Sequence, residues 1–450
     1  MLATIYFSFS NNLVFALFLY FSIITLMILF ISEFIVKIEL FLLFIIGVTI
    51  LLPPVKISSG LPIIRIEEFI MYGLFPIIWF NFRINRASVN LNGVFSIMIF
   101  TIALSTWHAN TFLDYRFTLR DLFEIIKILK IWLVIFIISK TKIEDRVLAK
   151  IPVWILYYLF ISAFIGILQT ENFLSINNYL TPLYSPEHHA DYATHRILGT
   201  SSNPNDFGLL LNLGIIFSLI YWIHNKKGTK LWMLPLIFTM LVTLLLTGSR
   251  TSVAALIIVY TSLLFYHLFN PVPRFSNIEI LIILIITIVI GLVVGTYIAI
   301  DSIQRLVSGI NIAEDKSFLM RLSRWQIGWL KFKQSPVFGW GPAKEFQSTV
   351  VDSEYLLTLR RYGIIGIFPY LAFFIVPIVH IKKYSKNIIT NRWFFNSMIS
   401  LSFILLITNI TSITINNEQI MDLWAILLGI AYSLINQRKN ENINYKSSLS

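Results

Sequence analysis

The chain alternates long apolar runs with short polar connections over almost its whole length. Each run is close to the ~20 residues that an α-helix needs to cross the hydrocarbon core of a bilayer. The pattern therefore predicts one all-α integral membrane protein over residues 1–450, with about 12–13 transmembrane helices. The apolar runs are residues 11–32, 35–52, 67–82, 90–108, 122–140, 151–168, 205–222, 231–247, 251–269, 278–300, 355–380, 393–411 and 419–435.

The connections between these runs differ in their content of Lys and Arg. Cytoplasmic loops of membrane proteins carry the excess of these residues, which orients the chain. The long connections 169–204 and 301–353 then face outward, as does the short turn 248–251, and the polar tail 440–450 is expected to be a disordered cytoplasmic segment. The basic connections carry Arg83 and Arg86; Lys140, Lys142, Arg146 and Lys150; Lys226, Lys227 and Lys230; and Lys382, Lys383, Lys386 and Arg392.

Composition narrows the class of protein further. With 57% hydrophobic and 13% charged residues, the chain cannot be a soluble globule. The net charge of +12 lies mostly in short connections between spans, which favours membrane lipids as its partner and argues against nucleic acid. The chain has no cysteine, so disulfides, thiol catalysis and thiolate metal sites are excluded.

The polar connection 301–353 contains a predicted amphipathic helix. Leu322, Trp325, Trp329 and Phe332 recur three or four residues apart and share a face flanked by basic residues. Such a helix is expected to lie at the membrane surface. The turn-rich run 335–342 follows and must fold back on itself. Together these segments are predicted to bind an anionic headgroup, with the helix contributing the guanidinium groups of Arg321 and Arg324.

Ionisable residues also occur inside the predicted span 122–140. Arg120, Glu124 and Lys127 are spaced to pair along one helix. A charged side chain within a span costs roughly 2.5–3.5 kcal/mol and usually faces the bundle or a wet cavity, although a long stem can also snorkel to the interface. Both alternatives remain for Lys127, whereas snorkelling is expected for Lys130.

The connection 169–204 offers a possible metal site and a possible anion site. His188, His189 and Asp191 could ligate zinc, but adjacent histidines rarely reach one ion and the HExxH spacing is absent. A plain polar loop without metal is therefore expected. Asn203 is predicted to cap the next span, and the helix amides behind such a cap can bind an anion. Arg196 lies nearby in sequence and is a candidate ligand for it.

Arg250 lies in a tight turn between two apolar runs, within Gly248-Ser249-Arg250-Thr251. It is held near the outer interface and has no acidic neighbour in sequence. A guanidinium at a helix N-terminus suits phosphate, because its planar donors can bind two oxygens at once. Anchoring to lipid headgroups is the alternative, and substrate binding is the favoured interpretation.

Four motifs in order resemble the bacterial O-antigen polymerase and ligase family, over roughly residues 190–370. The resemblance implies a GT-C-like helical glycosyltransferase of the inner membrane, with its active site facing the periplasm or exterior and with no metal or other cofactor. It also implies polyprenyl-diphosphate-linked glycans as substrates. The motifs are Arg196…Asn203-Pro204-Asn205, Gly248-Ser249-Arg250-Thr251, Arg324-Trp325…Ser335-Pro336-Val337-Phe338-Gly339-Trp340-Gly341 and Asp352-Ser353-Glu354-Tyr355…Arg361-Tyr362-Gly363-Ile364-Ile365-Gly366.

One departure favours a polymerase over a ligase. Ligases of this family resemble one another in a His-Asn pair ahead of the late span, where this chain has Asp352-Ser353-Glu354-Tyr355. A polymerase would join repeat units into O-antigen or capsule-like polysaccharide, and family likeness implies a chain-length-regulating partner. A flippase or other transporter of lipid-linked oligosaccharide and a structural scaffold are the rivals from other classes.

The predicted reaction assigns two roles to these residues. Displacing a lipid diphosphate requires stabilisation of its growing negative charge, which cations can supply in a water-excluded site. The predicted diphosphate-binding residues are Arg196, Arg250, Arg321, Arg324 and Lys127. The acceptor hydroxyl needs a general base, for which Glu354 and Asp352 are the candidates. Charge placement at a helix N-terminus is the alternative for both carboxylates.

Overall fold

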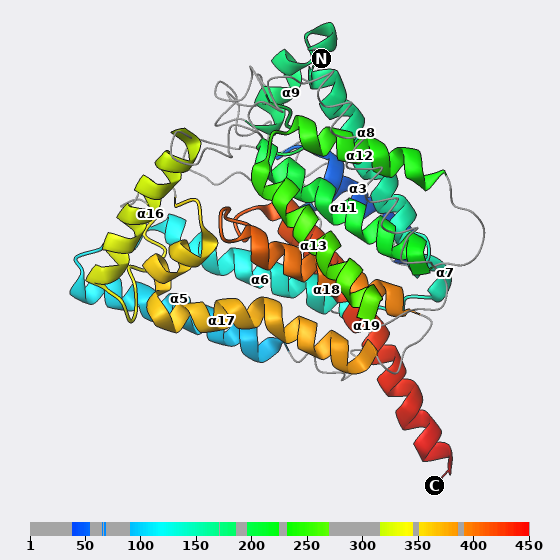
Figure 1. Ribbon diagram of the computed structural model, residues 1–450. Coiled ribbons are helices and arrows are strands. Elements are labelled where there is room, and N and C mark those ends of the chain that lie inside the picture. The colour runs from blue at the N-terminus through cyan, green and yellow to red at the C-terminus, as the bar shows by residue number, and fades with distance from the viewer. Residues whose placement is uncertain are drawn as a thin grey trace, which may run out of the picture.

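The computed structural model describes residues 38–54, 65, 67–68, 91–170, 172–185, 196–224, 232–269, 316–344, 351–385 and 391–449. Its elements in these ranges are helical (Figure 1), as predicted for an all-α membrane protein. They are α3 (Ile38–Leu51), α5 (Asn92–Phe112), α6 (Leu119–Lys140), α7 (Asp145–Leu148), α8 (Ile151–Thr170), η1 (Phe173–Ser175), α9 (Asn177–Tyr184), α11 (Pro204–His224), α12 (Met233–Leu246), α13 (Arg250–Phe269), α16 (Lys316–Gln334), α17 (Glu354–Ser385), α18 (Arg392–Thr408) and α19 (Glu418–Leu449).

Ten of the thirteen predicted runs coincide with helices among the described residues. The runs 11–32 and 278–300, and 67–82 beyond its first two residues, lie outside them. Within the described ranges, five helical segments are long and apolar enough to cross a membrane. The chain is therefore a multi-pass integral membrane protein. The five segments are Asn92–Phe112, Asp145–Thr170, Pro204–Trp222, Glu354–Tyr384 and Glu418–Arg438.

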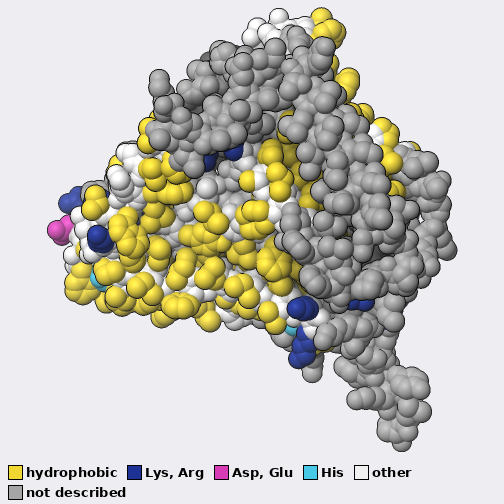
Figure 2. All heavy atoms as spheres, viewed as in Figure 1, with side chains coloured by type: hydrophobic (Ala, Val, Ile, Leu, Met, Phe, Trp, Pro, Cys, Tyr) yellow, Lys and Arg dark blue, Asp and Glu magenta, His cyan; other side chains and the backbone are white. Residues whose placement is uncertain are grey.

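The outer face of the bundle is hydrophobic, as a lipid-facing surface must be. α5 and α17 pack side by side along one edge (Figure 1), and Figure 2 shows a broad band of apolar side chains over this region. Phe100 on α5 is 66% exposed and Phe368 on α17 is 67% exposed. Water would penalise such exposure, whereas hydrocarbon chains of lipid do not.

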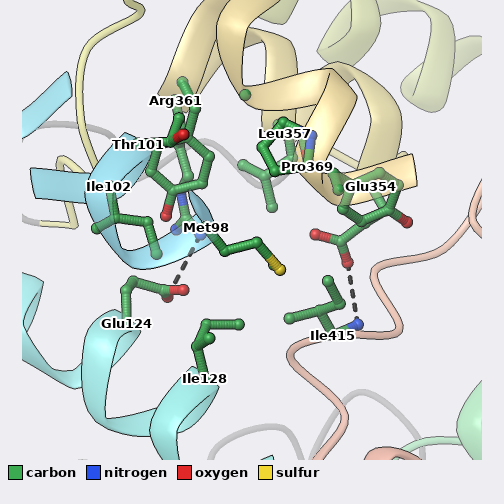
Figure 3. A pocket seen from close by; sticks show the side chains of 14 residues that line it. Met98, Thr101, Ile102, Glu124, Ile128, Glu354, Leu357, Arg361, Pro369 and Ile415 are labelled. Atoms are coloured by element: carbon green, nitrogen blue, oxygen red, sulfur yellow. Dashed lines mark hydrogen bonds and ion pairs between the residues drawn. The ribbon is translucent and has the colours of Figure 1, made fainter. Parts of the chain in front are cut away.

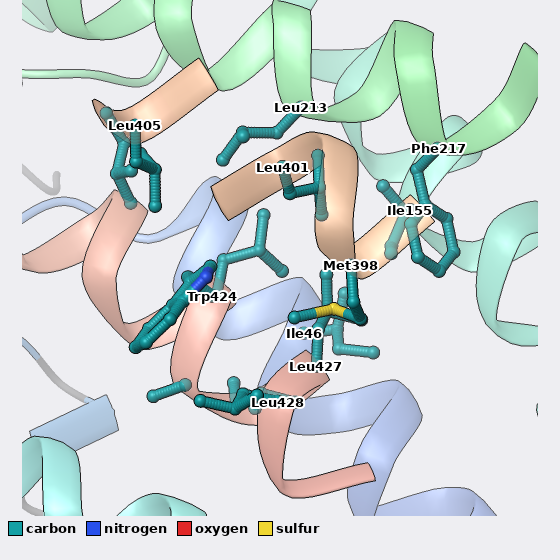
Figure 4. Close-up of a cluster of buried hydrophobic side chains, with 14 of the residues drawn as sticks. Ile46, Ile155, Leu213, Phe217, Met398, Leu401, Leu405, Trp424, Leu427 and Leu428 are labelled. Atoms are coloured by element: carbon teal, nitrogen blue, oxygen red, sulfur yellow. The ribbon is translucent and has the colours of Figure 1, made fainter. Parts of the chain in front are cut away.

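Helix α19 forms the centre of the bundle and packs most extensively against α6. Trp424 and Leu427 of α19 are buried against side chains that include Met398 and Leu401 of α18, with Ile46 of α3 nearby (Figure 4). Both long sides of α19 are therefore covered by other helices. This explains why its apolar residues surround the whole helix rather than following one stripe.

Helix α17 is interrupted at Gly363, where the backbone has φ 62° and ψ −163°. This conformation is essentially restricted to glycine. The freed amides of Ile364 and Ile365 donate to the carbonyls of Pro336 (2.9 Å) and Val337 (3.3 Å). A Cβ on Gly363 would lie 2.1 Å from the Val337 oxygen. The turn after α16 is thus fastened to the break in α17, and the two glycine-containing motifs interlock.

Two features differ from the sequence predictions. The connection 169–204 contains α9 and η1 rather than only loop. The tail expected to be disordered from Asn440 continues as part of α19 to Leu449 (Figure 1). Residues 438–449 contain neither Pro nor Gly, so nothing in them breaks the helical hydrogen bonding that α19 begins in the core. The amphipathic helix was predicted correctly and is α16, with Phe332 buried and Trp329 45% exposed.

The prediction that Lys130 snorkels to the interface is wrong. Its side chain is 2% exposed, and its Nζ is bound to Glu68 and, at 3.1 Å, to Asp422. Glu67 and Glu68 form buried ion pairs with Arg65 and Lys130, respectively. Burying an ammonium group is tolerable only when carboxylates replace its water, and the helical pattern alone could not show that these partners are present.

Candidate functional site

A small pocket lies where α5, α6, the first turns of α17 and the turn between α18 and α19 meet (Figure 3). We call the last of these the 409–417 turn. The cavity measures about 30 Å³, which is room for one or two water-sized groups. Its wall is mostly apolar, with Met98, Ile102 and Ile128 among the residues that line it. The polar side chains Glu124, Glu354 and Arg361 face one another across it.

Glu354 begins α17 and is only 5% exposed. Its backbone amide donates to the carbonyls of Asn409 and Ser412, both at 3.0 Å, and its Oε2 accepts the Ile415 amide at 3.1 Å. The other carboxylate oxygen faces the pocket (Figure 3). These backbone contacts fix the side chain in one orientation, which a general base requires. The 409–417 turn supplies them all.

Glu124 on α6 is surrounded by cations. Within the described residues, its carboxylate pairs with Lys127 at 2.7 Å, with Lys344 at 2.8 Å and with Arg361 at 3.4 Å. Lys127 also donates to the Asn416 side chain. Lys127 therefore faces the interior of the bundle and does not snorkel to the membrane interface. Three cations share one carboxylate, so the group carries a surplus of positive charge.

The remaining candidates from the sequence lie around the same end of the bundle. Arg196 donates to the Thr247 carbonyl and to the Asn205 side chain, both at 2.8 Å. It thus ties the start of α11 to the turn before α13. Arg250 is the first residue of α13 and is half-buried. Its neighbour Thr251 accepts a hydrogen bond from Thr411 of the 409–417 turn, 3.1 Å away.

Asn203 caps α11 as predicted: its Oδ1 accepts the amides of Asn205 (2.9 Å) and Asp206 (3.0 Å). Ser249 similarly accepts the Ser252 amide at 3.4 Å. The prediction that the α11 amides behind the cap receive an external anion is not supported. Asn203 already occupies two of these donors, and the Asp206 carboxylate lies beside the cap.

Asp352 and Arg324 pair with each other at 2.8 Å. Their side chains are 23% and 43% exposed, so this carboxylate is more solvated than Glu354. Arg321 lies on α16, one turn before Arg324, and is half-buried. Of the seven predicted site residues, only Glu354 lines the pocket formed by the described residues. Two of the others are connected to the 409–417 turn, Lys127 through Asn416 and Arg250 through its neighbour Thr251.

Three residues that complete the site were not assigned to it from the sequence. Arg361 was quoted only as part of a motif, Glu124 only as a partner in a helix, and Lys344 had no assigned role. Lys344 is placed by the turn that the Gly363 break fastens, and its amide donates to Asp121 of α6 at 3.1 Å. One sequence feature could have indicated these residues, namely the Tyr-Gly pair before Ile364, which interrupts a long helix. The histidines His188 and His189, with Asp191, lie outside the described residues.

Comparison with known families matches residues 235–371, from α12 into α17, to the family described as O-antigen ligase. Over these residues the chain resembles the O-antigen polymerase and ligase family. The matched segment carries Arg250, α16, the Gly363 break and Glu354. The match supports a glycosyltransferase-like enzyme but does not separate polymerase from ligase. The comparison with curated proteins finds no match.

Proposed function

We propose that this protein is a polysaccharide polymerase. It would transfer a growing glycan from its polyprenyl diphosphate to the terminal sugar of a lipid-linked repeat unit, in O-antigen or capsule biosynthesis. The single observation that carries the proposal is Glu354. Its carboxylate is buried, held by the Ile415 amide, and turned into a pocket that a hydroxyl group can enter.

The chemistry requires one bond to form and one to break. The acceptor hydroxyl oxygen attacks the anomeric carbon while Glu354 takes its proton. The bond from that carbon to the diphosphate oxygen then breaks, and the polyprenyl diphosphate leaves with the electron pair. In a site shielded from water, cations stabilise this charge more strongly than in bulk solvent. From the resemblance to the family, we expect this site to lie on the periplasmic or exterior side of the inner membrane.

The surplus of positive charge around Glu124 is suited to that leaving group. Lys127, Lys344 and Arg361 carry three positive charges against the two carboxylates of Glu124 and Glu354. A diphosphate entering beside Glu124 would gain cations that are already desolvated and oriented. Arg196, Arg250, Arg321 and Arg324 are proposed to guide the lipid-linked diphosphate toward it.

The identity of the base is tested with Glu354→Gln, using purified protein and lipid-linked repeat units. Loss of a general base lowers the rate roughly 10²–10⁴-fold. Asp352→Asn is the matched control, because this carboxylate lies two residues away but pairs with Arg324. Its effect should be far smaller. Undiminished polymerisation by Glu354→Gln at equal protein level would eliminate it as the base.

The phosphate-binding role is tested with Arg250→Ala, scored by polymer ladders on a gel. Shortened or absent ladders are expected, whereas Arg146→Ala, on a 73% exposed side chain of the short helix α7, should leave them intact. Full ladders from Arg250→Ala would remove Arg250 from the site.

Deleting the gene separates the alternatives. If the protein is a polymerase, its loss should leave single repeat units on the surface glycan. We expect this outcome because Asp352-Ser353-Glu354-Tyr355 replaces the His-Asn pair of the ligases. Loss of glycan from its lipid A core anchor would support the ligase instead. Movement of lipid-linked oligosaccharide by purified protein, without new glycosidic bonds, would support a transporter.

A further inference from the structure

The 409–417 turn holds Glu354 at two points, its backbone amide and its carboxylate. The carbonyls of Asn409 and Ser412 accept the amide, both at 3.0 Å, and the Ile415 amide donates to the carboxylate at 3.1 Å. The direction of the carboxylate therefore depends on how residues 409 and 415 are placed relative to each other. Because the turn contains no helix, no regular ladder of backbone hydrogen bonds fixes that placement.

The side chain of Asn409 closes the turn. Its Oδ1 accepts a hydrogen bond from the hydroxyl of Thr414, the residue before Ile415. Its Nδ2 donates to the Tyr370 hydroxyl at 2.5 Å. A carboxamide suits this position because it carries an acceptor and a donor in one small group. Asn409 is fully buried, so water does not compete for either hydrogen bond.

Asn409 also bridges the interrupted helix α17. Glu354 lies before the break at Gly363, and Tyr370 lies after it and is 3% exposed. The break removes the regular helical geometry between these two segments. The backbone carbonyl of Asn409 holds the first segment through the Glu354 amide, and its side chain holds the second through Tyr370. One residue of the turn thus connects two segments that α17 does not hold in line by itself.

The pocket formed by the described residues is lined by the partners of Asn409 and not by Asn409 itself. Glu354, Tyr370 and Ile415 are among the lining residues. Asn409 can therefore act on a substrate only through the residues that it holds. Its removal should change how Glu354 is aimed and leave the groups that contact the substrate in the pocket.

We propose that Asn409 is a positioning residue for Glu354. By closing the 409–417 turn and bridging the two segments of α17, it aims the carboxylate at the acceptor hydroxyl. The inference rests on the proposed function, in which Glu354 is the general base. A misplacement of about 1 Å can cost roughly 10²-fold in rate, so a residue that does not contact the substrate can control the reaction.

Steady-state kinetics of purified Asn409→Ala with lipid-linked repeat units test this role. The kcat should fall roughly 10²-fold, while KM should stay near the wild-type value because the lining of the pocket is unchanged. Thr414→Val removes the donor to Asn409 and is the second variant, in case Asn409→Ala fails to fold. Thr414→Ser keeps this hydroxyl and should retain the wild-type kcat.

The matched control is Thr243→Val on α12. It removes a buried hydroxyl that donates within its own helix, to the Thr239 carbonyl at 2.8 Å. Its kcat should equal that of the wild type. A loss of kcat in Thr243→Val as large as that in Thr414→Val would show a general effect of buried hydroxyl groups and overturn the inference.

A double variant separates positioning from a purely structural effect. If Asn409 acts through the base, Asn409→Ala should cost little more in the Glu354→Gln protein, which has no base left to aim. Two losses that multiply in the double variant, or a folded Asn409→Ala with wild-type kcat, would overturn the inference while an impaired Glu354→Gln still supports the proposed function. Normal polymerisation by Glu354→Gln would instead remove the base and, with it, the role of Asn409.

Discussion

Two buried charge clusters lie one turn apart on α6 and have opposite surpluses. Around Glu124, three cations meet one carboxylate. Around Lys130, three buried carboxylates and the half-buried Glu418 meet two cations. The first cluster borders a cavity, whereas the second is packed between helices. The first surplus suits an anion beside Glu124, whereas the carboxylates of the second cluster hold Lys130 and Arg65 between the helices.

The comparison also explains why the two lysines of one helix face differ in role. Lys127 is 11% exposed and lies near the pocket, so its charge can be offered to a ligand that enters there. Lys130 is 2% exposed and is fully engaged by Glu68 and Asp422. We infer that the first contributes to substrate binding and the second to the cohesion of the bundle.

The largest effect on stability is expected from Lys130→Met. Removing this ammonium leaves Glu68 and Asp422 buried without their counter-charge, which typically costs about 3–5 kcal/mol. Thermal unfolding in detergent should show a large drop in melting temperature. Adding Asp422→Asn to the same chain should recover part of the loss. A Lys130→Met protein as stable as the wild type would show that the cluster is hydrated rather than buried.

Gly363→Ala should be the next most damaging change. Alanine at φ 62° and ψ −163° costs of order 1–3 kcal/mol, and its Cβ would meet the Val337 oxygen. The turn carrying Lys344 should then detach from α17, so polymerisation should fall together with melting temperature. Gly93→Ala on α5 is the control, because a Cβ there meets no heavy atom within 4 Å. Equal behaviour of the two variants would contradict the interlocked turn.

Glu124→Gln should destabilise the protein less, by about 1–2 kcal/mol, because Lys344 is 30% exposed and reaches water. The sharper readout is binding. With its carboxylate gone, the cation group should bind inorganic pyrophosphate more tightly, and pyrophosphate should raise the melting temperature of Glu124→Gln more than that of the wild type. A larger rise in the wild type would argue against an anion site here.

The smallest effect is expected from Asp422→Asn alone. An amide keeps the shape of the carboxylate, its oxygen can still accept a hydrogen bond from Lys130, and Glu68 remains as the counter-charge. The change in unfolding free energy should therefore stay below about 1 kcal/mol. Melting curves of this variant and of Lys130→Met, run side by side, measure the difference. A loss as large as that of Lys130→Met would mean that Asp422, rather than Glu68, supplies the main counter-charge of Lys130.

The hydrophobic pattern was sufficient to predict the helices. The predicted spans that correspond to α6, α11 and α17 have bounds within a few residues of those helices. The reason is that a bilayer crossing demands about 20 apolar residues in a row. The caps were also predictable, since Asn203 and Ser249 act on amides only two or three residues away. Helix capping depends only on residues that are close together in the sequence, so it can be predicted from them.

The sequence by itself determined the class of protein, the family motifs and Glu354 as a candidate base. Only the tertiary structure decided what the charges do. Lys130 meets Asp422 across 292 positions of chain, and Arg361 meets Glu124 across 237. The energy of a charge inside a bundle is set by the few groups that replace its water, and those groups come from helices whose packing the spacing of residues along the chain does not specify.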